Sequence, residues 1–180
     1  MRTNYATNPT LASNQTGWVS SGTATVTRQA DTDFTAGFCV EVTSAVTNGG
    51  LEAKGQVWPA SDGDTVTVGF TEKTVSGNTG WTVRQRGYSA DGSSGGSLAT
   101  IGTFTAQATA TRHVFTFNLA NYAGYARLAI YVVPTSASSG VVRISDLTFE
   151  RGTTVGTWFT AAKERARALL QSTFQLRPGV

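Results

Sequence analysis

The chain has 180 residues, of which only 14% are charged, with 20 glycines, one cysteine and a net charge of +3. This length fits one domain with a short appendage, and a single cysteine excludes an internal disulfide framework. No apolar run approaches the length of a membrane-spanning helix and no secretory signal opens the chain. We therefore expect neither a membrane partner nor a secreted precursor.

The positive charge is confined to the end of the chain. Residues 1–160 carry ten basic and ten acidic side chains, whereas residues 161–180 carry four basic side chains and one acidic side chain. A neutral body offers no electrostatic track for phosphate groups, so we do not expect nucleic acid as a partner.

Short runs of alternating apolar and polar residues predict β-strands along most of the chain. Residues 1–18 precede these runs without periodicity, and Leu11 and Trp18 are their expected anchors beneath the sheet edge. Turn-forming clusters separate the runs, and no helical pattern lies between them. The expected strands are Thr23–Arg28, Phe38–Val42, Leu51–Trp58, Thr65–Thr71, Thr79–Tyr88, Leu98–Ala106, Arg112–Leu119, Tyr125–Val133 and Val141–Glu150. Their number and spacing predict an all-β fold, an antiparallel two-sheet jelly-roll sandwich over residues 1–159.

The last expected strand changes phase in its middle. Val142 and Ile144 share one face by alternation, and Leu147 and Phe149 share the other. A change of phase of this kind is typical of a β-bulge, which re-aims the side chains that follow it. We therefore expect a bulge at Ser145 and Asp146.

Residues 160–180 differ in character from the rest and predict a short basic C-terminal α-helix with a tail. Strong helix formers follow Thr160, a plausible N-cap. The apolar seam of this helix consists of Ala162, Ala166, Leu169 and Thr173, with Leu170 and Phe174 beside it. A helix of about four turns is marginal alone in water. It either folds back on its own sandwich or serves attachment, by docking on another protein or by self-association.

The sequence offers little for catalysis. His113 is the single histidine and lies in phase with Phe115 and Phe117, as a packed or edge residue would. A serine–histidine–aspartate arrangement would require it, and no Gly-x-Ser-x-Gly elbow exists. One histidine and one cysteine do not make a zinc site, and Cys39 is expected to be a half-buried, inert thiol. We expect no enzyme; the remaining catalytic alternative is a glycosidase, which would need two carboxylates in a cleft.

Aromatic and arginine side chains on predicted sheet faces are the better candidates for binding. The alternation places them opposite the apolar side of their strands, and the set is Trp58, Arg84, Arg86, Tyr88, Tyr125, Arg127 and Tyr131. Rings that stack on sugars and guanidinium forks that bind hydroxyl groups are typical of carbohydrate recognition. The structural alternative is that these residues cover the open sheet face or pack beneath loops.

Three short motifs carry a resemblance to a known family. They are Asn8-Pro9-Thr10-Leu11 followed by Gly17-Trp18, then Asp62-Gly63-Asp64-Thr65-Val66-Thr67-Val68, and the closing strand from Val142 to Gly152. In this order they resemble carbohydrate-binding-module-like, galactose-binding-like jelly rolls. The trailing residues 153–159 look like the ending of such domains in minor tail proteins of bacteriophages that infect actinobacteria. The likeness covers residues 4–159.

The resemblance bears on metal binding. Members of this family often hold a structural calcium ion between a glutamate of the opening motif and an aspartate of the closing strand. Here Ala12 stands where the glutamate would fall, and Asp146 is the only matching carboxylate. Calcium prefers six to eight oxygen ligands with several carboxylates, so we expect no cofactor or metal.

Two functions follow from the resemblance. The first is a non-enzymatic virion protein, either a minor tail protein or a capsid decoration protein. It would be made in the host cytoplasm, anchored to other virion proteins or to itself by the C-terminal helix, and able to bind a host-surface glycan. The alternative is a carbohydrate-binding module of a polysaccharide-degrading enzyme. The basic helix weighs against that alternative, since a linker would be expected in its place.

Overall fold

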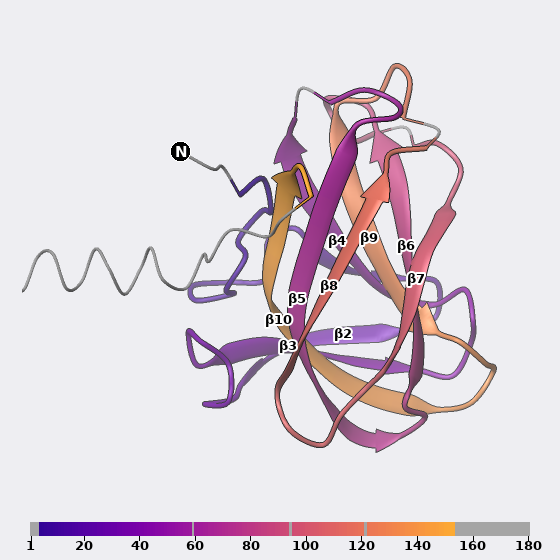
Figure 1. The fold of residues 1–180 in the computed structure, drawn as a ribbon. Coiled ribbons are helices and arrows are strands. Elements are labelled where there is room, and N and C mark those ends of the chain that lie inside the picture. Colours follow the sequence, from indigo (N-terminus) through magenta and orange to yellow (C-terminus); the bar gives the residue numbers. More distant parts are fainter. Residues whose placement is uncertain (1–3, 59, 94, 121, 154–180) are drawn as a thin grey trace, which may run out of the picture.

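The protein is a sandwich of two five-stranded β-sheets (Figure 1). The computed structural model describes residues 4–58, 60–93, 95–120 and 122–153. Its strands are β1 (Trp18–Ser21), β2 (Thr25–Ala30), β3 (Phe38–Ser44), β4 (Gly50–Val57), β5 (Thr65–Gly77), β6 (Gly80–Tyr88), β7 (Ala99–Thr105), β8 (Thr111–Asn118), β9 (Arg127–Pro134) and β10 (Gly140–Arg151).

The order of the strands is that of a jelly roll. The first sheet runs β1-β4-β9-β6-β7 and the second runs β2-β3-β10-β5-β8, and every neighbouring pair is antiparallel. Figure 1 shows the two sheets facing each other across the core. The all-β, two-sheet prediction is therefore confirmed. The predicted C-terminal helix and its seam lie outside the described residues.

The core lies between the sheets and is built from the apolar side of each alternating strand. From the second sheet come Val40, Val42, Val66, Val68 and Phe70, all fully buried. The first sheet supplies Leu51, Trp81, Val83, Leu128, Ile130 and Val132. The anchors predicted from the N-terminal segment, Leu11 and Trp18, are both buried in the same core. Burial of this apolar set is the main stabilisation of the fold.

A bulge in β10 completes the core. Asp146 has a φ of 57°, and the pairing of β10 with β5 shifts between Ser145 and Thr148. Aspartate tolerates this left-handed conformation better than most residues because its short side chain bonds locally. The shift turns Leu147 and Phe149 onto the same buried side as the first half of the strand. The predicted bulge is confirmed.

The N-terminal segment closes one open side of the sandwich. The Tyr5 amide donates to the Phe149 carbonyl of β10 at 3.0 Å, and the Tyr5 carbonyl accepts from the Gln56 amide of β4 at 2.7 Å. One residue thus connects the two sheets. Within the described parts of the chain, no helix has the length and apolarity needed to cross a membrane.

Candidate functional site

The outer side of the first sheet gathers most of the polar and aromatic residues expected to bind. On β9, Tyr131 is the cross-strand partner of both Glu52 on β4 and Arg84 on β6. One step along, Ala129 pairs in the same way with Lys54 and Arg86, and Arg127 pairs with Tyr88. We call this set of eight residues the arginine face. The register brings together five of the seven candidates: Arg84, Arg86, Tyr88, Arg127 and Tyr131.

A hydrogen-bonded tyrosine pair lies at the centre of the arginine face. The hydroxyl oxygens of Tyr88 and Tyr131 are 2.5 Å apart. The Lys54 ammonium lies 4.8 Å and the Arg86 guanidinium 5.2 Å from the centre of the Tyr88 ring. These cations cover the Tyr88 ring, which explains why Tyr88 is only 8% exposed; its neighbour Tyr131 is 4% exposed. Burial raises the pKa of both phenols.

The tyrosine rings are therefore covered on the outer side of the sheet, which is the structural alternative of the two. Alternation placed them correctly on the outer side of the sheet. It could not show that long side chains from neighbouring strands lie over them, because that depends on cross-strand register. The exposed part of the face consists of the cationic groups instead of the rings.

The arginines of this face differ in how they are held. Arg86 donates through Nε to the Gly96 carbonyl at 2.7 Å, and a hydrogen bond to Tyr131 raises its pKa. Arg127 donates to the Ala90 carbonyl at 2.5 Å. Arg84 is half-buried, and none of the described residues hydrogen-bonds or ion-pairs with it. Its guanidinium fork is therefore available to a ligand.

One acid belongs to the arginine face. Glu52 is 8% exposed, and its Oε1 lies 3.5 Å from the Lys54 ammonium. This contact offsets the charge of Lys54. The remaining three cations are arginines without a carboxylate within ion-pair distance in the described residues.

Trp58 is not part of this face, and its predicted solvent exposure is wrong. The residue is 1% exposed, and its ring stacks on that of Tyr5 with centroids 5.0 Å apart. The pairing of β4 with β9 shifts register between Lys54 and Val57. This irregularity breaks the alternation that would have put Trp58 beside Glu52, so the indole enters the core beneath the N-terminal segment.

Tyr125 also lies apart from the face, because β9 begins two residues later. Its amide donates to the Tyr122 carbonyl at 3.0 Å in a turn, and its ring packs against Gly87. A side chain at Gly87 would collide with this ring, with its Cβ only 2.8 Å from the Tyr125 ring carbon Cδ2. Tyr125 therefore belongs to the loop end of the sandwich.

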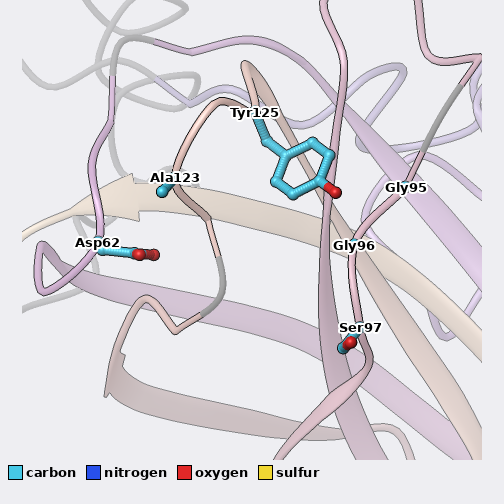
Figure 2. A pocket seen from close by; sticks show the side chains of 6 residues that line it. All are labelled: Asp62, Gly95, Gly96, Ser97, Ala123 and Tyr125. Atoms are coloured by element: carbon cyan, nitrogen blue, oxygen red, sulfur yellow. The ribbon is translucent and has the colours of Figure 1, made fainter.

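The loop end holds an open pocket of about 540 Å³. Its lining comes from three loops, namely Asp62, Gly95, Gly96, Ser97, Ala123 and Tyr125. Figure 2 shows Tyr125 reaching toward the Gly95–Gly96 segment, with Asp62 on another wall. The Asp62 carboxylate accepts a hydrogen bond from the Tyr122 amide, which orients it. Since Arg86 binds the carbonyls of Gly95 and Gly96, the pocket adjoins the arginine face.

The residues at the family's calcium position do not fit that ion. Asp146 is buried, and its Oδ2 accepts from the Thr35 hydroxyl at 3.1 Å, while its Oδ1 has no partner among the described residues. Burial raises the pKa of this carboxyl. The carbonyls of Leu11 and Ala12 are taken by the Arg28 guanidinium. One carboxylate is too few for calcium, and the described residues hold no group of three or more histidine, cysteine or acidic side chains that could bind a metal ion.

His113 is a packed residue, as the sequence indicated. Its Nε2 lies 3.0 Å from the buried Glu72 Oε1, and its ring contacts Phe104 with centroids 4.6 Å apart. Glu72 also accepts from the Gln107 amide at 3.1 Å. The His113–Glu72 pair thus joins β5 and β8 to the loop between β7 and β8.

Sequence reasoning missed the pocket. Asp62 and Ser97 belong to separate loops, and no periodic signal relates residues in different loops. Lys54 could have been found, since it alternates with Glu52 on the polar side of its strand.

Comparison with known proteins defines the class of fold. No protein-family model and no curated protein sequence matches the chain. Among solved structures, the C-terminal family 22 carbohydrate-binding module of Clostridium thermocellum Xyn10B matches with a TM-score of 0.62 and 14% identity, over 85% of this chain and 97% of that one. A family 22 xylan-binding domain of Paenibacillus barcinonensis Xyn10C gives 0.58 and 9%, over 86% and 95%.

A phage protein is also among the matches. The enzymatically active domain of bacteriophage CBA120 tailspike protein 4 gives a TM-score of 0.53 at 16% identity, over 83% of this chain and 21% of that one. At these identities the likeness shows the fold alone. The chain has the jelly-roll fold of carbohydrate-binding modules.

Proposed function

We propose that this protein is a non-catalytic glycan-binding domain that uses the arginine face. The observation that carries the proposal is Arg84, a half-buried residue whose guanidinium has no partner among the described residues and which is the cross-strand neighbour of Tyr131 in the Tyr88–Tyr131 pair. Leaving donors of a guanidinium unpaired in a partly desolvated place costs free energy, which a ligand's oxygen atoms would recover. The fold supports this function, because the solved structures it resembles include xylan-binding domains.

A glycan array tests the proposal. The chain should bind at least one polysaccharide, and replacing Arg84 and Arg127 together by alanine should weaken that binding about 10-fold or more. Arg151→Ala is the matched control, since Arg151 lies at the end of β10 in the other sheet and should leave binding unchanged. Thermal melting of each variant checks that the fold is intact. Undiminished binding by the double variant would contradict the proposal.

We further propose that the domain is displayed on a bacteriophage virion, as a minor tail protein or capsid decoration protein that contributes to host attachment. The resemblance of residues 153–159 to the ending of such domains in phage minor tail proteins supports this reading. Residues 160–180 would attach the domain to other virion proteins or to a second copy. The virion would be assembled in the host cytoplasm, where the chain is made.

Light scattering tests the attachment role. If the full chain is oligomeric and a chain ending at Phe159 is a folded monomer, residues 160–180 are an assembly device. If both are monomeric and equally stable, self-association is contradicted and the segment needs another virion protein, which pull-down with purified virion proteins would identify.

The alternative is that the domain is a carbohydrate-binding module of a polysaccharide-degrading enzyme. Its support is that the matching structures include modules from xylanases and other glycan-degrading enzymes. This alternative expects residues 160–180 to be dispensable for assembly and expects binding to plant-type polysaccharides. An oligomer that depends on residues 160–180 would favour the virion role. A monomer that binds plant-type polysaccharides on the array and captures no virion protein in the pull-down would favour the enzyme module.

A further inference from the structure

We infer that the arginine face selects acidic polysaccharides, whose sugars carry carboxylates, and that Arg84 binds the carboxylate. This inference rests on the proposed glycan-binding function and names its ligand class. It follows from what the face exposes, from how charge is divided between the two sheets, and from the geometry of Arg84.

The face is not built for stacking sugar rings. Aromatic platforms bind sugars through an open ring face, but the residues Tyr88 and Tyr131 are only 8% and 4% exposed. Lys54 and Arg86 lie over the Tyr88 ring. A ligand approaching the sheet therefore meets cationic groups first, and anionic substituents complement them best.

Two cations of the second sheet, Lys73 and Arg143, are ion-paired with carboxylates, whereas three arginines of the first sheet are not. On the second sheet, Lys73 lies 2.7 Å from Asp33, and Arg143 lies 2.9 Å from both Asp31 and Glu41. Each of these cations is thus neutralised by a neighbouring carboxylate. The domain body is neutral overall, so the three arginines without carboxylate partners give the first sheet a local excess of positive charge.

These arginines form a continuous strip. Arg84 and Arg86 are two residues apart on β6, which places their Cα atoms about 7 Å apart on one face. Arg127 is the cross-strand partner of Tyr88, the next outward residue along β6. Arg86 and Arg127 already donate to backbone carbonyls, which hold them in place. A polysaccharide lying along β6 would pass all three.

Arg84 is the specific element of the strip. The residue is half-buried and its guanidinium has no partner among the described residues, while its cross-strand neighbours are Tyr131 and Thr100. A planar guanidinium binds a planar carboxylate through two parallel hydrogen bonds, a geometry that lysine cannot reproduce. A uronic acid therefore fits this position better than a neutral sugar.

Affinity electrophoresis with one polymer in two forms tests the inference. The probes are glucuronoxylan and the same glucuronoxylan after chemical reduction of its carboxyl groups. We expect the intact polymer to bind about 10-fold more tightly, and we expect this difference to shrink as salt rises from about 0.05 M to about 0.5 M. Arg84→Gln should remove the preference and Arg84→Lys should restore only part of it. Arg151→Gln should leave it unchanged.

The possible failures are distinguishable. Equal binding of both polymers overturns the acidic selectivity, and a preference that survives Arg84→Gln overturns the role of Arg84 as the carboxylate-binding residue. The glycan-binding function stands in both cases. Equally tight binding of dextran sulfate that is insensitive to Arg84→Gln would mean unselective attraction of polyanions, and would also overturn it. If no polysaccharide on the array binds, both the function and the inference fall.

Discussion

The thiol of Cys39 lies in β3, fully buried, with its sulfur 3.8 Å from the Gln29 carbonyl. Burial raises the pKa of this thiol to about 12. Because the thiolate is the reactive form, we expect Cys39 to resist iodoacetamide at pH 8 in the native protein and to react once the protein is unfolded in urea. Mass spectrometry measures the labelled fraction. Rapid labelling of the folded protein would contradict the burial.

Asp146 gives a prediction of pH-dependent stability. Burial raises the pKa of its carboxyl above the value in the unfolded chain. The protonated Asp146 carboxyl therefore contributes fully to folding stability below the unfolded pKa of about 4. This contribution is lost as pH rises through the folded pKa. Asp146→Asn keeps a side chain that suits the φ of 57° and removes the buried charge. We expect it to be more stable than the parent at pH 7, with the advantage disappearing near pH 3.5.

Urea unfolding at both pH values measures this difference. Asp33→Asn is the control, because Asp33 is half exposed and bonds Lys73 at the surface. A lower urea midpoint for Asp146→Asn at pH 7 would show that the carboxylate is stabilising instead.

At the scale of elements, the end of β4 decides the role of Trp58. The indole is buried between the Tyr5 ring and the core, so we expect Trp58→Ala to lower the free energy of unfolding by about 3 to 5 kcal/mol. Val57→Ala is the neighbouring control and should cost little, since Val57 is 53% exposed. Trp58→Phe should retain glycan binding. If the Trp58→Ala variant is as stable as the parent but fails to bind glycans, Trp58 is a binding residue after all.

Alternation of apolar and polar residues predicted some features of the strands and missed others. Alternation predicted most strands of the sandwich, because one side of each strand packs into the core. It located the bulge at Asp146, where the phase change is visible in the sequence. It did not reveal the irregularity between Lys54 and Val57, because no apolar residue there marks the change of phase. Trp58 was misplaced for that reason.

For the whole molecule, closure depends on the N-terminal segment. Tyr5 bonds strands of both sheets, and the Asn4 side chain bonds the carbonyl of Leu147 and the amide of Phe149 at 3.0 and 2.9 Å. Removing residues 1–7 breaks these bonds and uncovers Trp58. We expect the deletion to lower the free energy of unfolding by more than about 3 kcal/mol, measured by urea titration.

Two further variants serve as controls for the deletion of residues 1–7. Asn4→Ala removes only the side-chain bonds and should cost about 1 to 3 kcal/mol. A chain ending at Phe159 should unfold at the parent's urea midpoint if residues 160–180 serve attachment alone. An unchanged midpoint for the N-terminal deletion would refute the bridging role.

The sequence by itself determined the class of the fold, the core anchors Leu11 and Trp18, and the outward position of the arginines of β6 and β9. These features depend on local alternation and composition, which short stretches of chain carry. The tertiary structure decided which of these groups a ligand can reach. Cross-strand register laid cations over Tyr88, and the N-terminal segment covered Trp58. Arg84 was left without a partner for the same reason, because pairing between side chains from different strands is set by packing that no single stretch of sequence encodes.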